Sequence, residues 1–253
     1  MNEILNFISN TFYEDREAEE HTIEGDRFRD LMDLCFAHAD RFSLHRNNWP
    51  ESNDGALEQA LRPFCLGEYR SYAAICVSYD EQVWEKCFLY PAAEETKAIL
   101  LRCIPHLFGR EPDLAPEGHR EYLQKKYAPH DAAWDAAWEK IDSWWEDFRS
   151  RTGRSPSDEE FASFEREARR EADAIGRQIF DPKDYYSTMV DPCFFRGDEM
   201  FFETVTHERD CFAHAFSDRF GERLRALGEW VDISDRCHPP LFSLKKAKDL
   251  VLY

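Results

Sequence analysis

Apolar residues recur at helical spacing in several segments of the chain. Residues 1–20 place Ile4, Leu5, Ile8 and Phe12 on one face, which predicts a first helix. Residues 26–42 predict a second helix, whose apolar face holds Phe28, Leu31, Leu34, Cys35, His38 and Phe42. Two more helices are predicted at Ala92–Cys103, opened by Pro91, and from about His207 to Leu227, closed by Gly228.

Other segments are rich in residues that favour β-strands. Tyr72–Tyr79 and Val83–Tyr90 flank Asp80-Glu81-Gln82, which predicts a β-hairpin. Cys193–Arg196 and Met200–Thr206 flank Gly197-Asp198, a residue pair typical of hairpin turns. A short strand is predicted at Trp230–Ile233.

Residues 129–180 predict an antiparallel helical hairpin. The first helix has an apolar stripe of Trp134, Trp138, Ile141, Trp145 and Phe148. A break follows at Thr152-Gly153-Arg154, and a second helix is expected to start with Ser155 as N-cap, Pro156 at its first position and Asp158 in a capping box. The second stripe is Phe161, Phe164, Ala168, Ala172, Ile175 and Ile179.

These elements together predict the fold class. Strands come as adjacent pairs, and the chain lacks the regular strand–helix–strand alternation of a doubly wound sheet. We therefore expect one α+β domain over residues 1–253, with an antiparallel sheet built from two β-hairpins and packed with helices. The helical hairpin at 129–180 is expected to be an inserted lobe.

Acidic charge is concentrated at the start of the chain. The first 60 residues hold 14 acidic side chains, five basic ones and no lysine, which accounts for −9 of the formal net charge of −19. Such a surface repels the phosphates of nucleic acid and attracts a basic protein. The expected partner-binding residues are Glu14, Asp15, Glu17, Glu19, Glu20, the Glu24-Gly25-Asp26 segment, Asp30, Asp33 and, on the helical lobe, Trp144.

A zinc site is the first alternative. Cys35-Phe36-Ala37-His38 and Cys211-Phe212-Ala213-His214 are the same tetrapeptide, and in predicted helices each Cys and His share a face. Cys35, His38, Cys211 and His214 would supply a tetrahedral set of ligands. We favour the interpretation that these are core residues, because zinc sites usually draw two ligands from a turn rather than from helices.

Two other patterns are weaker. His207-Glu208 lies where a predicted strand gives way to a helix, a place that suits a proton-transfer histidine. The favoured interpretation is a helix start, capped by Thr206 and stabilised by Glu208 and Asp210. Glu95-Thr96-Lys97, with Asp80 and Glu81 upstream, matches part of a metal-dependent nuclease pattern but falls in a predicted helix.

Cysteine usage and hydropathy indicate a compartment. The eight cysteines form no Cys-x-x-Cys pair, the N-terminus lacks a signal-peptide pattern, and no apolar run of about 18 residues is present. We therefore expect reduced thiols in a cytoplasmic protein that does not cross a membrane.

The resulting hypothesis is a non-enzymatic cytoplasmic protein that binds a basic protein partner and requires no cofactor. It shares its charge logic with immunity proteins and nucleic-acid-mimicking inhibitors. The alternatives are a zinc metalloprotein or hydrolase that uses the Cys/His pairs, and an assembly subunit that docks through the helical lobe. The sequence predicts neither a catalytic residue nor an oligomeric state.

Overall fold

The computed structural model describes residues 3–11, 19–47, 52–71, 85–109, 118–236 and 242–253. The chain divides into two compact units. The first unit comprises Met1–Trp49, Asp54–Leu114 and Tyr186–Tyr253, and the second comprises Pro50–Asn53 and Ala115–Tyr185.

The first unit is built on a nine-stranded antiparallel sheet with the order β10-β1-β9-β8-β7-β4-β6-β5-β11. The antiparallel sheet packed with helices confirms the predicted α+β class. The strands are β1 (Glu3–Phe7), β4 (Arg41–Asn47), β5 (Gly67–Ser71), β6 (Glu85–Pro91), β7 (Thr188–Arg196), β8 (Glu199–Val205), β9 (Asp210–Ala215), β10 (Trp230–Asp232) and β11 (Lys248–Leu252).

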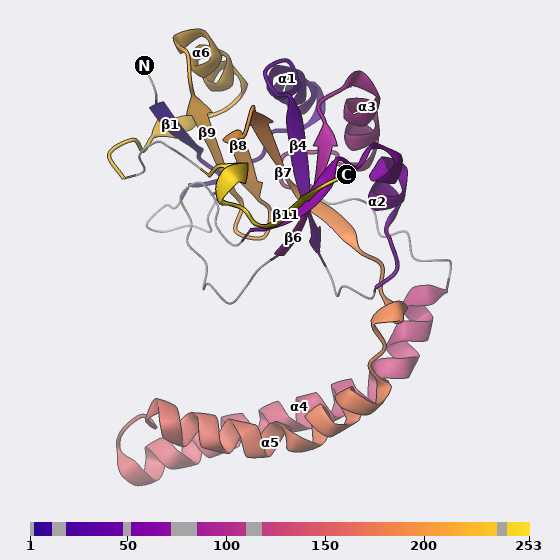
Figure 1. Cartoon of the computed structure of the whole chain (residues 1–253). Helices are drawn as coiled ribbons and strands as arrows, with labels where there is room; N and C mark the ends of the chain where they lie inside the picture. Colours follow the sequence, from indigo (N-terminus) through magenta and orange to yellow (C-terminus); the bar gives the residue numbers. More distant parts are fainter. Residues whose placement is uncertain (1–2, 12–18, 48–51, 72–84, 110–117, 237–241) are drawn as a thin grey trace. The chain divides into compact units, whose positions relative to one another are not determined.

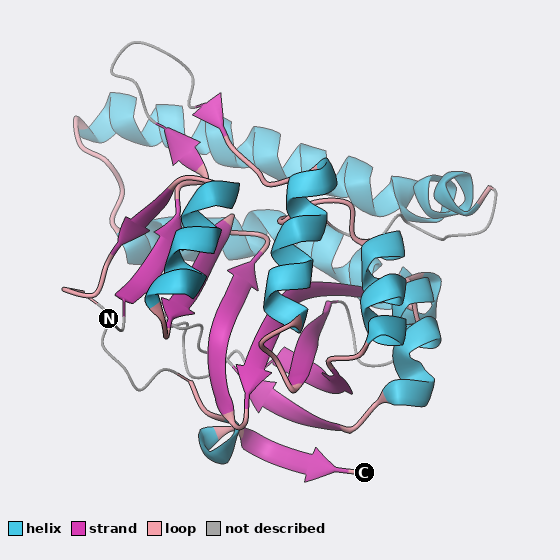
Figure 2. Cartoon of the chain, turned by 90° about the horizontal axis from the view of Figure 1, so that it is seen from above, coloured by secondary structure: helices cyan, strands magenta, loops and turns pink. Residues whose placement is uncertain are grey.

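Four helices lie on one face of this sheet (Figure 1). They are α1 (Gly25–Phe36), α2 (Ala56–Leu61), α3 (Glu94–Cys103) and α6 (Asp218–Leu227), and Figure 2 shows them from above the sheet. They bury the larger core, which includes Phe28, Leu31 and Phe220 from the helices and Phe42 and Phe194 from the sheet. A second core on other strand positions includes Ile4, Tyr69, Cys87, Cys193 and Phe212, with Phe242 and Leu244 packed among them.

The predicted helix at residues 1–20 is wrong, because Glu3–Phe7 is the strand β1. β1 lies inside the sheet between β10 and β9. Leu5 and Phe7 belong to the larger core while Ile4 belongs to the second, so both faces of the strand are apolar. A strand that is buried on both faces lacks the alternation of apolar and polar residues by which a strand is identified in a sequence. Its continuous apolar run also matches the spacing of an apolar helical face.

The same cause explains the error at residues 207–227. Asp210–Ala215 is the strand β9, and the helix α6 begins only at Asp218, where the Ser217 hydroxyl accepts a hydrogen bond from the Phe220 N–H. Cys211 and Ala213 lie in the larger core and Phe212 lies in the second. The helix predicted at 26–42 is likewise shorter, because α1 ends at Phe36 and Phe42 belongs to β4.

The predicted hairpin of Cys193–Arg196 with Met200–Thr206 is present in the sheet. β7 and β8 pair across Gly197-Asp198, and Gly197 adopts a left-handed φ of 60° that a glycine takes without steric cost. The predicted strand Val83–Tyr90 corresponds to β6, whose hairpin partner among the described residues is β5, in register from Gly67↔Leu89 to Ser71↔Glu85. Residues 72–84 lie outside the described residues. Helix α3 follows Pro91 as expected, although Pro91 itself ends β6.

The second unit contains the predicted helical hairpin, formed by α4 (His119–Thr152) and α5 (Asp158–Ile179). Helix α4 begins at His119, ten residues before the expected start of the hairpin at residue 129. The α5 N-cap is Ser157 rather than Ser155, and its capping-box partner is Glu160. At the other end of the hairpin the Asp184 carboxylate accepts hydrogen bonds from Tyr122, Tyr127 and Lys126 of α4.

A buried ion pair joins α2 to the sheet. Arg46 Nε on β4 lies 3.1 Å from Glu58 Oε2 on α2, and both residues are buried. The Ser187 hydroxyl also donates to Glu58 and accepts the Gly55 N–H at 2.9 Å, just before α2. Paired charges can be buried because each satisfies the other, whereas a single remaining charge would be very costly.

We predict that Glu58→Ala lowers the free energy of unfolding by about 1–3 kcal/mol, because the buried Arg46 guanidinium loses its closer carboxylate and is left with the more distant Asp54 Oδ1 at 3.7 Å. Urea unfolding followed by circular dichroism measures this loss. Glu222→Ala removes an exposed glutamate from α6 and should change the free energy by less than about 0.5 kcal/mol. Equal losses in the two variants would show that the buried pair has no special role.

Candidate partner-binding surface

The acidic segment identified from the sequence lies partly within the described residues. Glu14, Asp15 and Glu17 lie outside them. Glu19 and Glu20 form the strand β3, which pairs with β2 (Asn10–Thr11). Glu24, the N-cap of α1, is exposed. Gly25 follows it with a left-handed φ of 60°.

Helix α1 presents three carboxylates in one row. Asp26, Asp30 and Asp33 are at positions i, i+4 and i+7, which share a helical face, and all three are exposed. Phe28 and Leu31 on the other side of α1 are buried against the sheet. The burial of the apolar side therefore determines that the acidic row faces solvent.

Basic side chains compensate this row only in part. Arg29 Nη1 lies 3.1 Å from Asp26 Oδ1, but both side chains are highly exposed, so the pair contributes at most about 1 kcal/mol. Lys97 on α3 donates hydrogen bonds to Asp33 Oδ1 at 2.8 Å and to Glu94 Oε1 at 2.9 Å.

Hydrogen bonds to Asp33 and then to Glu94 raise the pKa of Lys97, so its ammonium stays protonated at neutral pH. This single positive charge is shared by two carboxylates, and the surface keeps a negative net charge. We name Asp26, Asp30 and Asp33 of α1, together with Glu94 of α3, the α1–α3 acidic surface.

Trp144 belongs to the second unit, where it packs between the two helices of the hairpin. Its ring is half-buried and stacks on Phe164 of α5 with centroids 4.6 Å apart and an interplanar angle of 8°. Phe148 lies at 5.2 Å on the same helix as Trp144. Trp138 is the more exposed indole, at 40%.

A shallow groove runs beside Trp144. Its lining consists of Trp144, Phe148, Arg151, Glu159, Glu160, Ser163, Phe164 and Glu167. Glu160 is held by the Arg154 guanidinium through two hydrogen bonds of 2.8 Å, while Glu159 and Glu167 have exposed side chains. Aromatic rings beside carboxylates provide a suitable environment for a cationic side chain.

The four proposed zinc ligands do not form one cluster, although Cys35 and Cys211 are close enough to interact electrostatically in the larger core. Cys211 and His214 lie on the strand β9, where positions i and i+3 point to opposite faces, so the shared helical face assumed for them does not exist. Cys35 and Cys211 are fully buried in the larger core, and burial raises the pKa of both thiols well above the usual value. His38 follows α1 and is exposed.

Within the described residues there is no group of three or more His, Cys, Asp or Glu side chains that could hold a metal ion. The weaker patterns are also explained locally. His207 and Glu208 lie in the exposed turn between β8 and β9, so Thr206 caps no helix there. Thr96 of the Glu95-Thr96-Lys97 triplet is buried on α3 and donates to the Pro91 carbonyl at 2.7 Å. Asp80 and Glu81 lie outside the described residues.

Sequence reasoning missed a buried pair of polar residues in the sheet. Asp191 on β7 is 3% exposed and has a left-handed φ of 56°. Its Oδ2 lies 3.3 Å from His45 Nδ1 on β4, and its Oδ1 accepts the Thr206 N–H at 2.6 Å. Pro192 is the sequence feature that could have indicated this site, because a proline inside a central strand usually marks an irregularity in the strand.

The surroundings of this pair indicate a structural role. Burial acts to raise the pKa of Asp191, but the hydrogen bonds from His45 and Thr206 outweigh it and bring the pKa below the usual value. The neighbouring Cys193 thiol is buried, and burial raises its pKa well above the usual value. A thiol in that state is a poor nucleophile.

Comparisons with known proteins add no assignment, since no family model, no curated protein and no solved structure matches this chain. None of the described helices is both long enough and apolar enough to cross a membrane.

We predict that Asp191→Asn makes stability less dependent on pH in the acid range. Because the pKa of Asp191 is lower in the folded chain than the value of about 3.9 for an unfolded chain, the carboxylate stabilises the fold above pH ~4 and this contribution is lost as the pH falls through the folded pKa. The free energy of unfolding of both chains is measured by urea unfolding at several pH values.

Asp210→Asn is the control, because the pKa of Asp210 is shifted in the opposite direction to that of Asp191. Burial, followed by the nearby Glu208 charge, raises the pKa of Asp210, so its ionised form does not favour folding. The amide should therefore leave neutral-pH stability unchanged or slightly higher. The assignment of Asp191 is wrong if its amide variant keeps the full acid dependence of the original chain.

Proposed function

We propose that this chain is a non-enzymatic binding protein that engages a basic protein partner through the α1–α3 acidic surface. The observation that carries the proposal is the row of Asp26, Asp30 and Asp33. Arg29 pairs with Asp26 only at the exposed surface, and Lys97 divides its charge between Asp33 and Glu94. Like charges held in a row produce a field that reaches about one Debye length, ~10 Å at 0.1 M salt. Such a field speeds the encounter with a cationic surface.

The groove beside Trp144, in the second unit, is a separate proposed contact for a basic protein. Electrostatic steering alone mainly changes the association rate, and slow release requires a well-packed contact. Trp144 supplies an aromatic contact surface, and Glu159 supplies negative charge beside it. The Arg154 guanidinium already lies 4.9 Å from the centroid of the Phe148 ring, and Glu167 is paired with Arg170. A lysine or arginine of a basic partner fits both features.

The expected location in the cytoplasm is part of this proposal. Among the cysteines that the structure describes, the thiols of Cys35, Cys65, Cys193 and Cys211 are free. Free thiols are typical of a reducing compartment.

We predict that the triple variant Asp26→Asn, Asp30→Asn, Asp33→Asn associates at least about tenfold more slowly with the partner at low salt, because the steering field is removed. The partner is captured at low salt from cells that make this protein and is then purified. Association rates are measured by surface plasmon resonance from low salt to about 0.5 M salt, where screening suppresses steering.

The chain offers a closely matched control. Asp135, Glu139 and Asp142 on α4 have the same i, i+4, i+7 spacing, are exposed, and change the net charge equally when replaced by their amides. This control should keep the original rate. If the association rate changes neither with salt nor with the α1 substitutions, the α1–α3 acidic surface is not the binding site.

We predict that Trp144→Phe increases the dissociation rate several-fold while the hairpin stays folded, because a phenyl ring keeps the stack on Phe164 but loses contact area. Trp138→Phe, on the same helix, is the matched control. Dissociation rates from the same experiment and the helical circular dichroism signal separate lost binding from lost folding. Equal rates in both variants would show that Trp144 is only a packing residue.

A further inference from the structure

A basic cluster lies in the first unit where three elements that are distant in the sequence come together. Arg196 is the last residue of β7, Arg219 and Arg223 belong to α6, and His38 follows the end of α1. All four residues are exposed. Helices α1 and α6 pack side by side on the same face of the sheet (Figure 1). We name these four residues the arginine cluster.

Aromatic contacts hold two members of the cluster in place. The half-buried Phe216 ring, just before α6, carries the Arg196 guanidinium at 5.1 Å from its centroid. The His38 ring packs against Phe216 and Phe220, with centroid distances of 5.4 Å to each and interplanar angles of 72° and 87°. His38 and Arg196 therefore contact the same ring, and tertiary packing determines their proximity.

Helix α6 presents its two arginines on one side. Arg219 and Arg223 are at positions i and i+4, which share a helical face, and they flank the buried Phe220 in the sequence. Asp218 and Glu222 have the same spacing but precede the arginines by one residue, which places them about 100° away around the helix. The acidic side chains of α6 therefore lie on a different side from its arginines.

The electrostatics of His38 show that the cluster converges. Partial desolvation and then the positive charges of Arg223, Arg196 and Arg219 lower the pKa of His38. A charge has this effect only when it lies near the imidazole, so guanidinium groups from both β7 and α6 act on one ring.

The guanidinium groups of the cluster have no acidic partner among the described residues. Neither Arg196, Arg219 nor Arg223 forms an ion pair or a hydrogen bond with a carboxylate there. The nearby carboxylates of the β7–β8 turn are already used. Asp40 accepts the Gly197 N–H at 2.6 Å, and Asp198 pairs with basic residues outside the cluster.

Unpartnered cations are unusual on a chain with a net charge of −19. Like charges at i and i+4 of a helix destabilise it slightly, so the cluster gains when an anion binds between its members. The acidic remainder of the chain repels anions, but salt screens that field beyond ~10 Å at 0.1 M. A single compact anion therefore responds mainly to the local positive charge. A long polyanion such as nucleic acid also meets the exposed carboxylates elsewhere on the chain.

We propose that the arginine cluster binds a phosphate monoester group. Its oxygens accept hydrogen bonds from Arg196, Arg219 and Arg223, whose planar guanidinium groups match phosphate geometry. The charge of such a group, about −2 at neutral pH, suits several guanidinium groups better than the single charge of a carboxylate does. The group belongs either to a small phosphate ester or to a phosphorylated protein side chain, and the experiment separates these two sources.

The first test uses the His38 imidazole as a reporter. The pKa of His38 is measured by NMR on the full chain, in millimolar inorganic phosphate and in sodium chloride of the same ionic strength. We expect phosphate to raise the pKa of His38 by at least about 0.5, because a bound anion favours the protonated imidazole. An identical pKa of His38 in the two salts overturns the proposal.

The second test identifies the source of the phosphate group. A short peptide with one phosphoserine and no other charged side chain is compared with inorganic phosphate and with the same peptide carrying serine. Tighter binding of the phosphopeptide than of phosphate supports a phosphorylated protein, and equal binding supports a small phosphate compound. Equal binding of the serine and phosphoserine peptides overturns the proposal.

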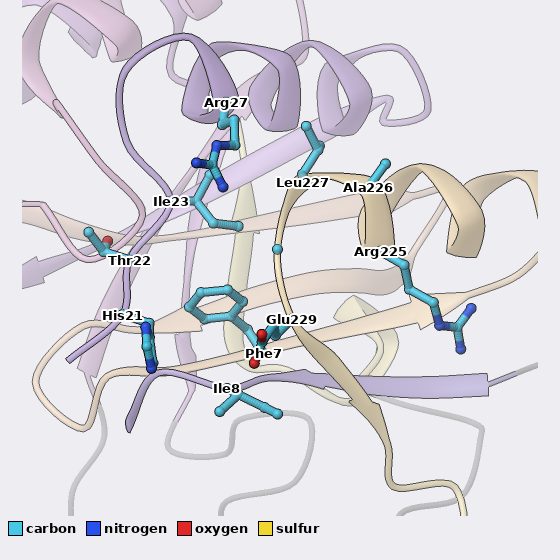
Figure 3. A pocket seen from close by; sticks show the side chains of 11 residues that line it. Phe7, Ile8, His21, Thr22, Ile23, Arg27, Arg225, Ala226, Leu227 and Glu229 are labelled. Carbon is cyan, nitrogen blue, oxygen red and sulfur yellow. The ribbon is translucent and has the colours of Figure 1, made fainter. Parts of the chain in front are cut away.

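Variants assign the binding to the arginine cluster. Arg219→Gln with Arg223→Gln should weaken phosphate binding at least about tenfold, because charge-assisted hydrogen bonds are lost. The control is Arg27→Gln with Arg102→Gln, which removes the same charge from exposed residues of the first unit. Figure 3 shows Arg27 at the start of α1, beside the Phe7 ring. This control should bind phosphate as the original chain does.

Equal affinities of the cluster variant and its control would overturn the assignment. Circular dichroism of each variant shows that the chain is still folded, so a loss of binding cannot be attributed to unfolding. No residue of the arginine cluster belongs to the α1–α3 acidic surface or lines the groove beside Trp144. Failure of the phosphate proposal and failure of the proposed function are therefore distinguishable.

Discussion

Strand β4 lies between β7 and β6 in the middle of the sheet, and its side chains alternate between two buried environments. Phe42 and Leu44 enter the larger core beneath the helices, while Ser43 lies on the other side and bonds to the Tyr69 hydroxyl at 2.9 Å. A strand buried on both faces restricts everything packed against it. The apolar side of α1 must face the sheet, and its acidic row can only face solvent.

Buried polar groups follow from the same constraint. A charge inside this sheet is tolerated only with a partner, and Arg46 with Glu58 and His45 with Asp191 are such pairs. His45 with Asp191 joins β4 to β7, which are far apart in the sequence, whereas Arg46 with Glu58 joins β4 to α2, the next described element along the chain. We interpret them as contacts that specify which element packs where, because a wrong neighbour would leave a charge unpaired.

For the function that we propose, the described part of the chain presents two surfaces with different chemistry. The α1–α3 acidic surface acts over a distance and is sensitive to salt. The groove beside Trp144 acts in contact, through an aromatic ring and a nearby glutamate.

Local sequence patterns were sufficient to predict the elements that have one buried apolar face and one exposed polar face. The helices α4 and α5, the apolar side of α1 and the β7–β8 turn at Gly197 were predictable, because neighbouring residues alone distinguish their buried and exposed positions. The exposed aspartates of α1 could be identified for the same reason. The strands β1 and β9 could not be predicted, since burial on both faces removes their alternation. The contacts of Lys97 with Asp33 and of Asp191 with His45 were decided only by tertiary structure, because folding brings together residues whose spacing along the chain carries no signal.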